Sequence, residues 1–453
     1  MNNLNSFQRK MVYLVGILVL MVPIFLLGST EAGVGFKYGL ARLRQDYKLG
    51  ESSLGKVDPA SSTFNVVLLG FRGVAASVLW QQAEEQKATK NFAELAQTVE
   101  SISLLQPHFH KVWQYQAWNL AFNVSAECDD VKDRFHWVKQ GAKYLLRGIA
   151  ANERSPELQF DMGEFVGRKI GRSDEKESFR KFFRVDPRED LYAGKADPDI
   201  NPNNEDNYQR AKTWFQRSND LIEAGEEQHR MDTILMLAYP YHSTRDYAQA
   251  RKDEGLLDAE TTSAWQQFYT EWTEAYGKKE FMSPGGLIYF EAVTDDRVRA
   301  LCAKEGDKYP FEDKKHWVAR YQSTANYRFW RTRGQFEMQP TVQEATKALT
   351  VGRKLYFKQE LSASRENIEK GLREMKLAID THVGLTNNDS VLTDDDDLAE
   401  LILKAILVYQ RVLDLQEKKP LPDDFPLRAE YWDNPSWSHK RQELEDLFRR
   451  LSS

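Results

Sequence analysis

The sequence has very little cysteine: Cys128 and Cys302 are the only two in 453 residues. They lie far apart and lack the short paired spacing of a zinc ribbon or a redox motif. We therefore expect neither a disulfide framework nor a cysteine-based metal site. A single disulfide between Cys128 and Cys302 is compatible with the sequence.

The sequence also has no large excess of either positive or negative charge. The chain has 62 Lys and Arg against 68 Asp and Glu, for a formal net charge of −6, and the two signs are interspersed. No basic face or acidic tail stands out, so we do not expect a nucleic-acid partner.

Short catalytic motifs are absent as well. The sequence contains no P-loop, no dinucleotide-binding glycine pattern, no GxSxG elbow and no plausible Cys/His nucleophile pair. We expect a protein that is not an enzyme and that carries no cofactor.

The polar–apolar alternation of a half-buried strand is missing over any useful length, whereas apolar residues recur at helical spacing through most of the chain. This pattern predicts an all-α fold. We expect an N-terminal single transmembrane helix, then TPR-like (tetratricopeptide-like) helical hairpins that form an α-solenoid, then further helical hairpins.

The N-terminus carries one long apolar run. Residues 11–28, MVYLVGILVLMVPIFLLG, hold no charge and have about the length of a membrane-spanning helix. Arg9 and Lys10 end the tail 1–10, which favours a cytoplasmic N-terminus, a single-pass anchor in the cell membrane and a soluble domain on the non-cytoplasmic side. A cleaved signal peptide is the alternative, but LLGSTEAG offers no clean cleavage site. Residues 29–62, rich in Gly, Ser and charge, are typical of a juxtamembrane tether.

Residues 63–187 are expected to hold three irregular TPR-like hairpins. A tetratricopeptide repeat is a 34-residue pair of antiparallel helices with a proline near its end. With Pro107 in that position, KNF forms the turn between two helices and Trp113 falls in the next repeat. Five apolar residues then fall on the expected helical faces: Leu79, Ala83, Phe92, Val99 and Ile102. Pro187 has the corresponding spacing from Gly163.

The polar segment 188–207, rich in Pro, Asn and Asp, is expected to be a loop or linker. A second helical region, 208–427, follows, with a hairpin at about 341–380. Thr393 is predicted to cap a helix whose first turn holds the aspartates after it. Residues 428–453 are expected to form a C-terminal amphipathic helix. An aromatic stripe at helical spacing is more typical of a core than of a ligand site: Trp265, Phe268, Tyr269, Trp272 and Tyr276.

The segment LQPHFHKVWQYQAWNLAFNVS, 105–125, raises the question of a metal site. His108 and His110 alternate along the chain as some metal ligands do, but they follow Pro107 at a predicted turn, and no third ligand is fixed by spacing. We expect these two weak metal candidates to have a structural, interhelical role. A metal-dependent hydrolase that uses them with carboxylates such as Asp129 is an alternative.

A stack of TPR-like hairpins forms a concave surface suited to an extended or helical ligand. We therefore expect a non-catalytic scaffold that binds a protein or peptide partner. A self-associating structural envelope protein, which would be a homo-oligomer, is another alternative. Helical phase nominates six polar side chains as partner contacts: Gln82, Gln86, Gln116, Asn119, Asn123 and Gln159.

Five stretches occur in this order along the chain: LGKVDPASSTFNVVLLGFRGVAASVLW, LQPHFHKVWQYQAWNLAFNVSAE, GRKIGRSDEKESFRKFFRVD, RDYAQARKDEG and PLPDDFPL. Together they resemble the membrane-anchored TPR-containing proteins of planctomycete-type bacteria. The resemblance extends from about Leu54 to Leu427. It implies an N-terminal apolar helix followed by helical repeats, and it implies no activity and no catalytic residue.

Overall fold

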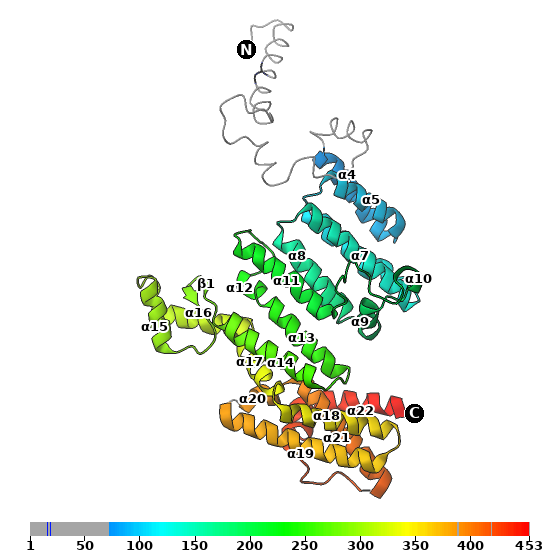
Figure 1. Cartoon of the computed structure of the whole chain (residues 1–453), viewed down its shortest axis with the longest axis vertical. Helices are drawn as coiled ribbons and strands as arrows, with labels where there is room; N and C mark the ends of the chain where they lie inside the picture. Colours follow the sequence, from blue (N-terminus) through cyan, green and yellow to red (C-terminus); the bar gives the residue numbers. More distant parts are fainter. Residues whose placement is uncertain (1–15, 17–18, 20–71, 387–388, 418, 453) are drawn as a thin grey trace. The chain divides into compact units, whose positions relative to one another are not determined.

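The computed structural model describes residues 16, 19, 72–386, 389–417 and 419–452 (Figure 1). Within these residues helices dominate, and the prediction of an all-α class is confirmed. The helices of the first half are α4 (Arg72–Ala88), α5 (Phe92–Leu105), α6 (His110–Trp118), η2 (Asn119–Val124), α7 (Val131–Ala151), α8 (Pro156–Glu164), η3 (Phe165–Ile170), α9 (Lys176–Arg184), α10 (Glu189–Tyr192) and α11 (Asn207–Glu223).

The second half continues with α12 (Thr233–Met236), α13 (Tyr239–Asp253), α14 (Ala259–Thr270), η4 (Glu271–Gly277), β1 (Phe281–Ser283), β2 (Gly286–Ile288), α15 (Asp295–Lys304), α16 (Phe311–Thr324), α17 (Tyr327–Glu337), α18 (Pro340–Phe357), α19 (Leu361–Thr386), α20 (Asp389–Thr393), α21 (Asp396–Glu417), η5 (Arg428–Trp432), η6 (Pro435–Trp437) and α22 (Ser438–Ser452).

Most of the predicted membrane anchor falls outside the described residues. Of the span 11–28, only Gly16 and Val19 are described, and the tail 1–10 and tether 29–62 lie outside. Among the helices that the structure describes, none combines the length and the apolar character needed to cross a bilayer. The anchor therefore stays a prediction.

The chain divides into two compact units, residues 1–158 and 159–453. In the first unit, α4 packs on α5, α5 on α6, and α6 on α7. The turn between α4 and α5 falls at KNF, as predicted, where Lys90 has a φ of 57° and the Asn91 side chain accepts from the Glu94 backbone N–H at 3.5 Å. The predicted apolar positions lie in the core of this unit, which contains Leu79, Ala83, Phe92, Leu95, Val99, Ile102 and Val112.

Three α-helices run without a break into π-helical segments: α6 into η2, α8 into η3, and α14 into η4. A π segment closes its hydrogen bonds over one residue more than an α-helix does. In η2 the Ser125 hydroxyl donates to the Ala121 carbonyl at 2.5 Å, which satisfies one backbone acceptor near the end of the segment.

In the second unit α11 packs on α13, α13 on α14, and α14 on α17. The aromatic stripe at the centre of this array is a core, as predicted. Trp265, Phe268, Trp272 and Tyr276 are each at most 1% exposed, and only Tyr269 is partly exposed. The indole N–H of Trp272 donates to the Tyr327 carbonyl at 3.1 Å, so burial of this ring leaves no unpaired donor.

A two-stranded hairpin stands in a chain for which the sequence predicts no strand. β1 and β2 pair antiparallel with Phe281 opposite Ile288. The turn reaches Gly286 at a φ of +84°, a conformation that disfavours any residue with a side chain. Strands of three residues are too short for alternation to be recognised in the sequence.

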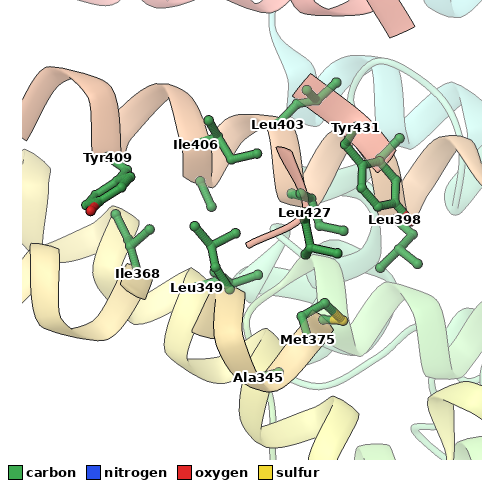
Figure 2. Packing of buried hydrophobic residues seen from close by; sticks show 14 of the residues in the cluster. Ala345, Leu349, Ile368, Met375, Leu398, Leu403, Ile406, Tyr409, Leu427 and Tyr431 are labelled. Carbon is green, nitrogen blue, oxygen red and sulfur yellow. The ribbon is translucent and has the colours of Figure 1, made fainter. Parts of the chain in front are cut away.

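The last third of the chain is built around α18, α19 and α21, which all pack on one another. Their facing side chains form the hydrophobic cluster of Figure 2, with Leu349, Ile368 and Met375 on one side and Leu403 and Ile406 on the other. This hairpin of α18 and α19 lies where the sequence predicts one. The terminal helix α22 begins at Ser438, after a 3₁₀ turn, η6.

The predicted helix cap at Thr393 is wrong. Thr393 ends the short helix α20, and α21 begins at Asp396. The Asp395 carboxylate accepts from the Leu398 backbone N–H at 2.7 Å and so caps α21. Asp395 also pairs with the buried Arg333, a tertiary contact that the local sequence does not reveal.

The segment 188–207 is more ordered than a simple linker. It contains α10, and α11 already begins at its last residue, Asn207. The buried Asp197 accepts from the Tyr192 hydroxyl at 2.6 Å, and the buried Asn201 amide donates to the Phe183 carbonyl at 3.0 Å. These internal bonds hold the segment beside α9.

Candidate functional site

The second unit contains a cavity of about 740 Å³ with charged and aromatic walls. This volume falls in the range of roughly 300–1,000 Å³ that is typical of ligand pockets. The lining residues are Gly171, Arg172, Lys176, Glu177, Arg180, Lys181, Arg184, Tyr208, Arg245, Asp246, Gln249, Ala250, Asp253, Glu254, Leu256, Trp265, Trp330, Arg333 and Asp397.

One side of the cavity, here called the α9 wall, comes from a single helical face. Lys176, Arg180 and Arg184 recur at four-residue intervals on α9, and Glu177 and Lys181 lie next to them. Residues four apart in an α-helix share a face, so this spacing directs all three cations to the same side.

A second side, the α13 wall, is built in the same way. Arg245, Gln249 and Asp253 follow one another at four-residue intervals on α13, with Asp246 and Ala250 beside them. The third side, the α17 wall, consists of Trp330 and Arg333 from α17, Trp265 from α14 and Asp397 from α21. The cavity is thus enclosed by faces of several helices.

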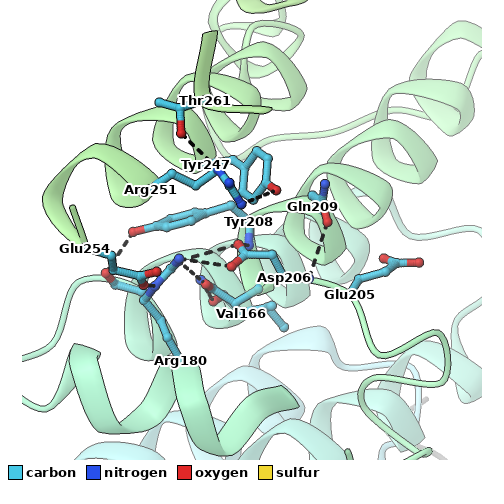
Figure 3. A network of polar contacts seen from close by, with 12 residues as sticks. Val166, Arg180, Glu205, Asp206, Tyr208, Gln209, Tyr247, Arg251, Glu254 and Thr261 are labelled. Atoms are coloured by element: carbon cyan, nitrogen blue, oxygen red, sulfur yellow. Dashed lines mark hydrogen bonds and ion pairs between the residues drawn. The ribbon is translucent and has the colours of Figure 1, made fainter. Parts of the chain in front are cut away.

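Arg180 is fixed by a polar network at the α9 wall (Figure 3). Its Nε donates to Glu254 Oε1 at 2.8 Å, its Nη2 to Asp206 Oδ2 at 3.0 Å, and its Nη1 to Asn207 Oδ1 at 2.5 Å. The guanidinium carbon also lies 5.0 Å from the centroid of the Tyr208 ring. With 4% exposure and three acceptors, Arg180 serves the fold and is not free to bind a ligand.

Burial controls the ionisation of the groups around Arg180. It raises the pKa of Asp206 above its ordinary value, although the charge of Arg180 acts in the opposite direction. Burial also raises the pKa of Tyr208 to about 12, so this phenol stays neutral and donates to the Gly171 carbonyl at 2.7 Å.

Arg245 connects the α13 wall to the α17 wall. Its guanidinium carbon lies 3.9 Å from the centroid of the Trp330 ring, and its Nε and Nη2 donate to Asp246 Oδ1 at 3.1 and 2.7 Å. Arg172 pairs with the same carboxylate. Burial alone would raise the pKa of Asp246, but Arg245 and Arg172 hold it below its ordinary value. The two arginines therefore share one carboxylate.

Arg333 belongs to a buried ion network. Its Nη2 donates to Glu337 Oε1 at 2.5 Å, its Nη1 pairs with Asp395, and Glu337 also accepts from Lys252 Nζ at 2.6 Å. Burial alone would raise the pKa of Glu337, but Lys252 and Arg333 hold it below its ordinary value. The network joins α13, α17 and the start of α21 and so fixes two walls of the cavity.

Two buried donors at the α17 wall lack an acceptor. Among the described residues, neither Arg333 Nε nor Trp265 Nε1 has a hydrogen-bond partner, although both side chains are at most 2% exposed. Leaving a buried donor unpaired costs about 1–3 kcal/mol.

Three cations of the α9 wall lie outside the ion pairs described above. Lys176 and Lys181 are exposed and Arg184 is half-buried, and none forms an ion pair with an acid of the described residues. These side chains are therefore the groups of the cavity best able to meet an anionic ligand.

The six predicted partner contacts do not line this cavity. Gln82 is exposed and Asn123 half-buried, while the other four, Gln86, Gln116, Asn119 and Gln159, are buried. Asn123 Nδ2 donates to Asn119 Oδ1 at 2.8 Å, and Asn119 Nδ2 donates to Gln116 Oε1 at 3.5 Å. The structure thus joins three of them into an amide ladder within the first unit, and their contact with a partner stays a prediction.

His108 and His110 have separate partners. His108 Nδ1 lies 3.1 Å from Asn152 Oδ1, and His110 Nδ1 lies 3.3 Å from the Ser155 hydroxyl. Burial lowers the pKa of His110 below its ordinary value. The described part of the chain contains no group of three His, Cys, Asp or Glu side chains able to hold a metal ion, and Asp129 is exposed. Cys128 and Cys302 are both free thiols.

Sequence reasoning missed the cavity because its residues look like the solvated faces of two helices. One signal was available. Most of the lining residues come from two of the five stretches on which the family resemblance rests, GRKIGRSDEKESFRKFFRVD and RDYAQARKDEG. These stretches supply the α9 wall and the α13 wall.

Comparison with known proteins found no matching family model, no matching curated protein and no matching solved structure. The functional proposal therefore rests on the geometry and charge of the cavity and on the organisation of the chain.

Proposed function

We propose that this protein is a membrane-anchored, non-catalytic scaffold of TPR-like helical hairpins that holds a segment of a protein or peptide partner in the cavity of its second unit. The observation that supports this function best is the construction of the cavity. Its α9 wall and α13 wall each follow one helical face over two turns, which gives an elongated polar surface rather than a point of convergence for catalytic groups.

The side chains of the cavity walls are held in place by the fold, which favours binding of a ligand over catalysis by groups that move. Arg180, Arg245 and Arg333 each make two or more ion-pair or hydrogen-bond contacts that are buried in the fold. A preorganised surface binds a flexible segment with less loss of side-chain freedom. Polar groups with fixed directions then give specificity for the partner.

The membrane location follows from the apolar run 11–28 and from Arg9 and Lys10 before it. In this arrangement the N-terminus is cytoplasmic and the helical units lie on the non-cytoplasmic side of the cell membrane. An anchored scaffold of this kind would hold its partner at the membrane surface.

Site-specific photocrosslinking in the native membrane tests this function. A photoreactive amino acid replaces Gln249, which lies half-buried on the α13 wall. Lys347, which is exposed on α18 away from the cavity, carries the same probe as a matched control. We expect a small, reproducible set of partner proteins crosslinked from position 249 and absent from position 347.

Two results would contradict the scaffold function. The same proteins crosslinked from both positions would show that capture does not involve the cavity. Crosslinks from position 249 only to other copies of this chain would favour the self-associating structural envelope protein instead.

A further inference from the structure

We propose that the segment bound in the cavity is acidic and that its carboxylates contact Lys176, Lys181 and Arg184 of the α9 wall. This inference rests on the proposed function and adds the chemistry of the partner. It makes the α9 wall a recognition surface, a role that the sequence does not assign to it.

The first support is a local reversal of charge. The chain as a whole carries a formal net charge of −6. The lining of the cavity instead contains seven Lys and Arg against five Asp and Glu. Because Asp206, Glu337 and Asp395, which are not part of the lining, neutralise Arg180 and Arg333, the attraction for an acidic ligand comes from the cations that form no ion pair.

The second support is which of these cations remain available. The fold pairs four of the seven with its own acids, namely Arg172, Arg180, Arg245 and Arg333. The other three, Lys176, Lys181 and Arg184, stand on one face of α9, and within the cavity α9 adds only the acid Glu177. The cations that form no ion pair are therefore confined to the α9 wall, whereas Asp253 and Asp397, which form no ion pair with a described residue, lie on the other two walls.

The α13 wall and the α17 wall determine how the segment is oriented. Asp253 lines the cavity on the α13 wall and Asp397 lines it on the α17 wall. These acids disfavour a carboxylate of the ligand, because like charges repel. The segment therefore places its acidic side chains against the α9 wall and its neutral groups against the other two walls.

Fluorescence anisotropy with two labelled peptides tests the proposal on the full-length protein in detergent. The acidic probe is an octapeptide of alternating Glu and Ala, and the neutral control has Gln in place of each Glu. We expect the acidic peptide alone to bind, and its Kd to rise with salt because screening weakens the contacts.

A triple variant, K176Q/K181Q/R184Q, removes the three free cations. We expect its Kd for the acidic peptide to rise at least about fivefold, since each exposed charge contact contributes modestly. The matched control, K347Q/K358Q/R411Q, removes three exposed cations that lie outside the cavity and form no ion pair in the described residues, and it should bind like the unmodified protein. If the triple variant fails to fold, the single Lys181→Glu variant replaces it, because that side chain is exposed.

Three outcomes would overturn the inference: equal binding of both peptides, equal loss of affinity in the two triple variants, or an unchanged Kd in the α9 variant. Succinate separates an acidic segment from a free small anion. Binding of succinate as tight as that of the peptide would overturn the assignment of a segment.

Failure of this inference is distinguishable from failure of the scaffold function. A partner crosslinked from position 249 together with no acidic-peptide binding would leave the scaffold function in place and remove the acidic chemistry. Acidic-peptide binding without any crosslinked partner would support the chemistry of the cavity and count against the scaffold.

Discussion

Lys252 of α13 donates a 2.6 Å hydrogen bond to Glu337 of α17, and the side chains of both residues are buried. The two helices carry different walls of the cavity, and this contact ties them together. The strength of the bond comes from the low polarity around it, which also makes an unpaired charge at either position costly.

Substitution of Glu337 with Gln should destabilise the second unit strongly. The change leaves Lys252 and Arg333 buried without their shared carboxylate, and loss of one member of a buried ion pair costs about 3–5 kcal/mol. Urea unfolding of the full-length protein measures the effect. The double variant K252M/E337Q should lose less than the sum of the two single changes, and additive losses would show that the two residues are not coupled.

Acid should destabilise the second unit through His242. Burial, helped by the charge of Arg245, lowers the pKa of this ring from 6.5 to about 3. Between these values the unfolded chain binds more protons than the folded one, so stability falls as the pH drops below 6.5, by up to about 1.4 kcal/mol per pH unit.

The variant His242→Phe should flatten this pH dependence, because a phenyl ring keeps the contacts with Tyr239 and Trp272 and does not titrate. The unfolding midpoint measured between pH 7 and 5 is the readout. His229→Phe is the control, since that ring is exposed and its loss should leave the slope unchanged. The same slope in both variants would assign the acid sensitivity to another group.

The first unit depends on a close approach between helices α6 and α7. A Cβ atom at Gly148 would lie 2.5 Å from Trp113 Cγ. We expect Gly148→Ala to lower the free energy of unfolding by about 1–3 kcal/mol, because overpacking at a helix contact outweighs the gain in helix propensity. Thermal unfolding tests this, with Gln140→Ala on the partly exposed side of α7 as the control. Equal behaviour of the two variants would show that the contact relaxes without cost.

Asn152 holds the histidine segment in place. Its Nδ2 donates to the carbonyls of Pro107 and Gly148 at 2.8 and 2.9 Å, and its Oδ1 faces His108. We expect Asn152→Ala to cost about 1–3 kcal/mol, because the part-buried Gly148 carbonyl loses this donor and the Pro107 carbonyl keeps only the indole N–H of Trp113. His108→Ala removes only the third contact and should cost less. The reverse order, measured by urea unfolding, would point to a larger role of the histidine.

The sequence was sufficient to predict the elements whose residues repeat at helical spacing. The stripe from Trp265 to Tyr276 is such a case, because large aromatic residues on one face have to be buried. The turn at KNF is another, since Asn91 is a residue that suits a helix cap.

The cavity could not be predicted from the local sequence pattern, because charged residues on a helix are usually exposed to solvent. Arg180 and Glu254 are 74 positions apart, and nothing near either residue indicates that they pair. The error at Thr393 has the same origin. Asp and Thr are both residue types that often cap helices. The residue that caps α21 is Asp395, and it also pairs with Arg333, a contact that the local sequence does not reveal.

The π-helical segments bear on which changes of length the protein can tolerate. A π turn carries one residue more than the α turn that would replace it. A deletion of one residue within η2, η3 or η4 would therefore convert the π turn to an α turn. The residues before and after the deletion would keep the same faces of the helix toward their neighbours. Elsewhere in these helices, the same deletion would rotate everything after it by about 100°. The three π segments are thus the positions at which these helices accommodate a shorter chain with the least change in packing.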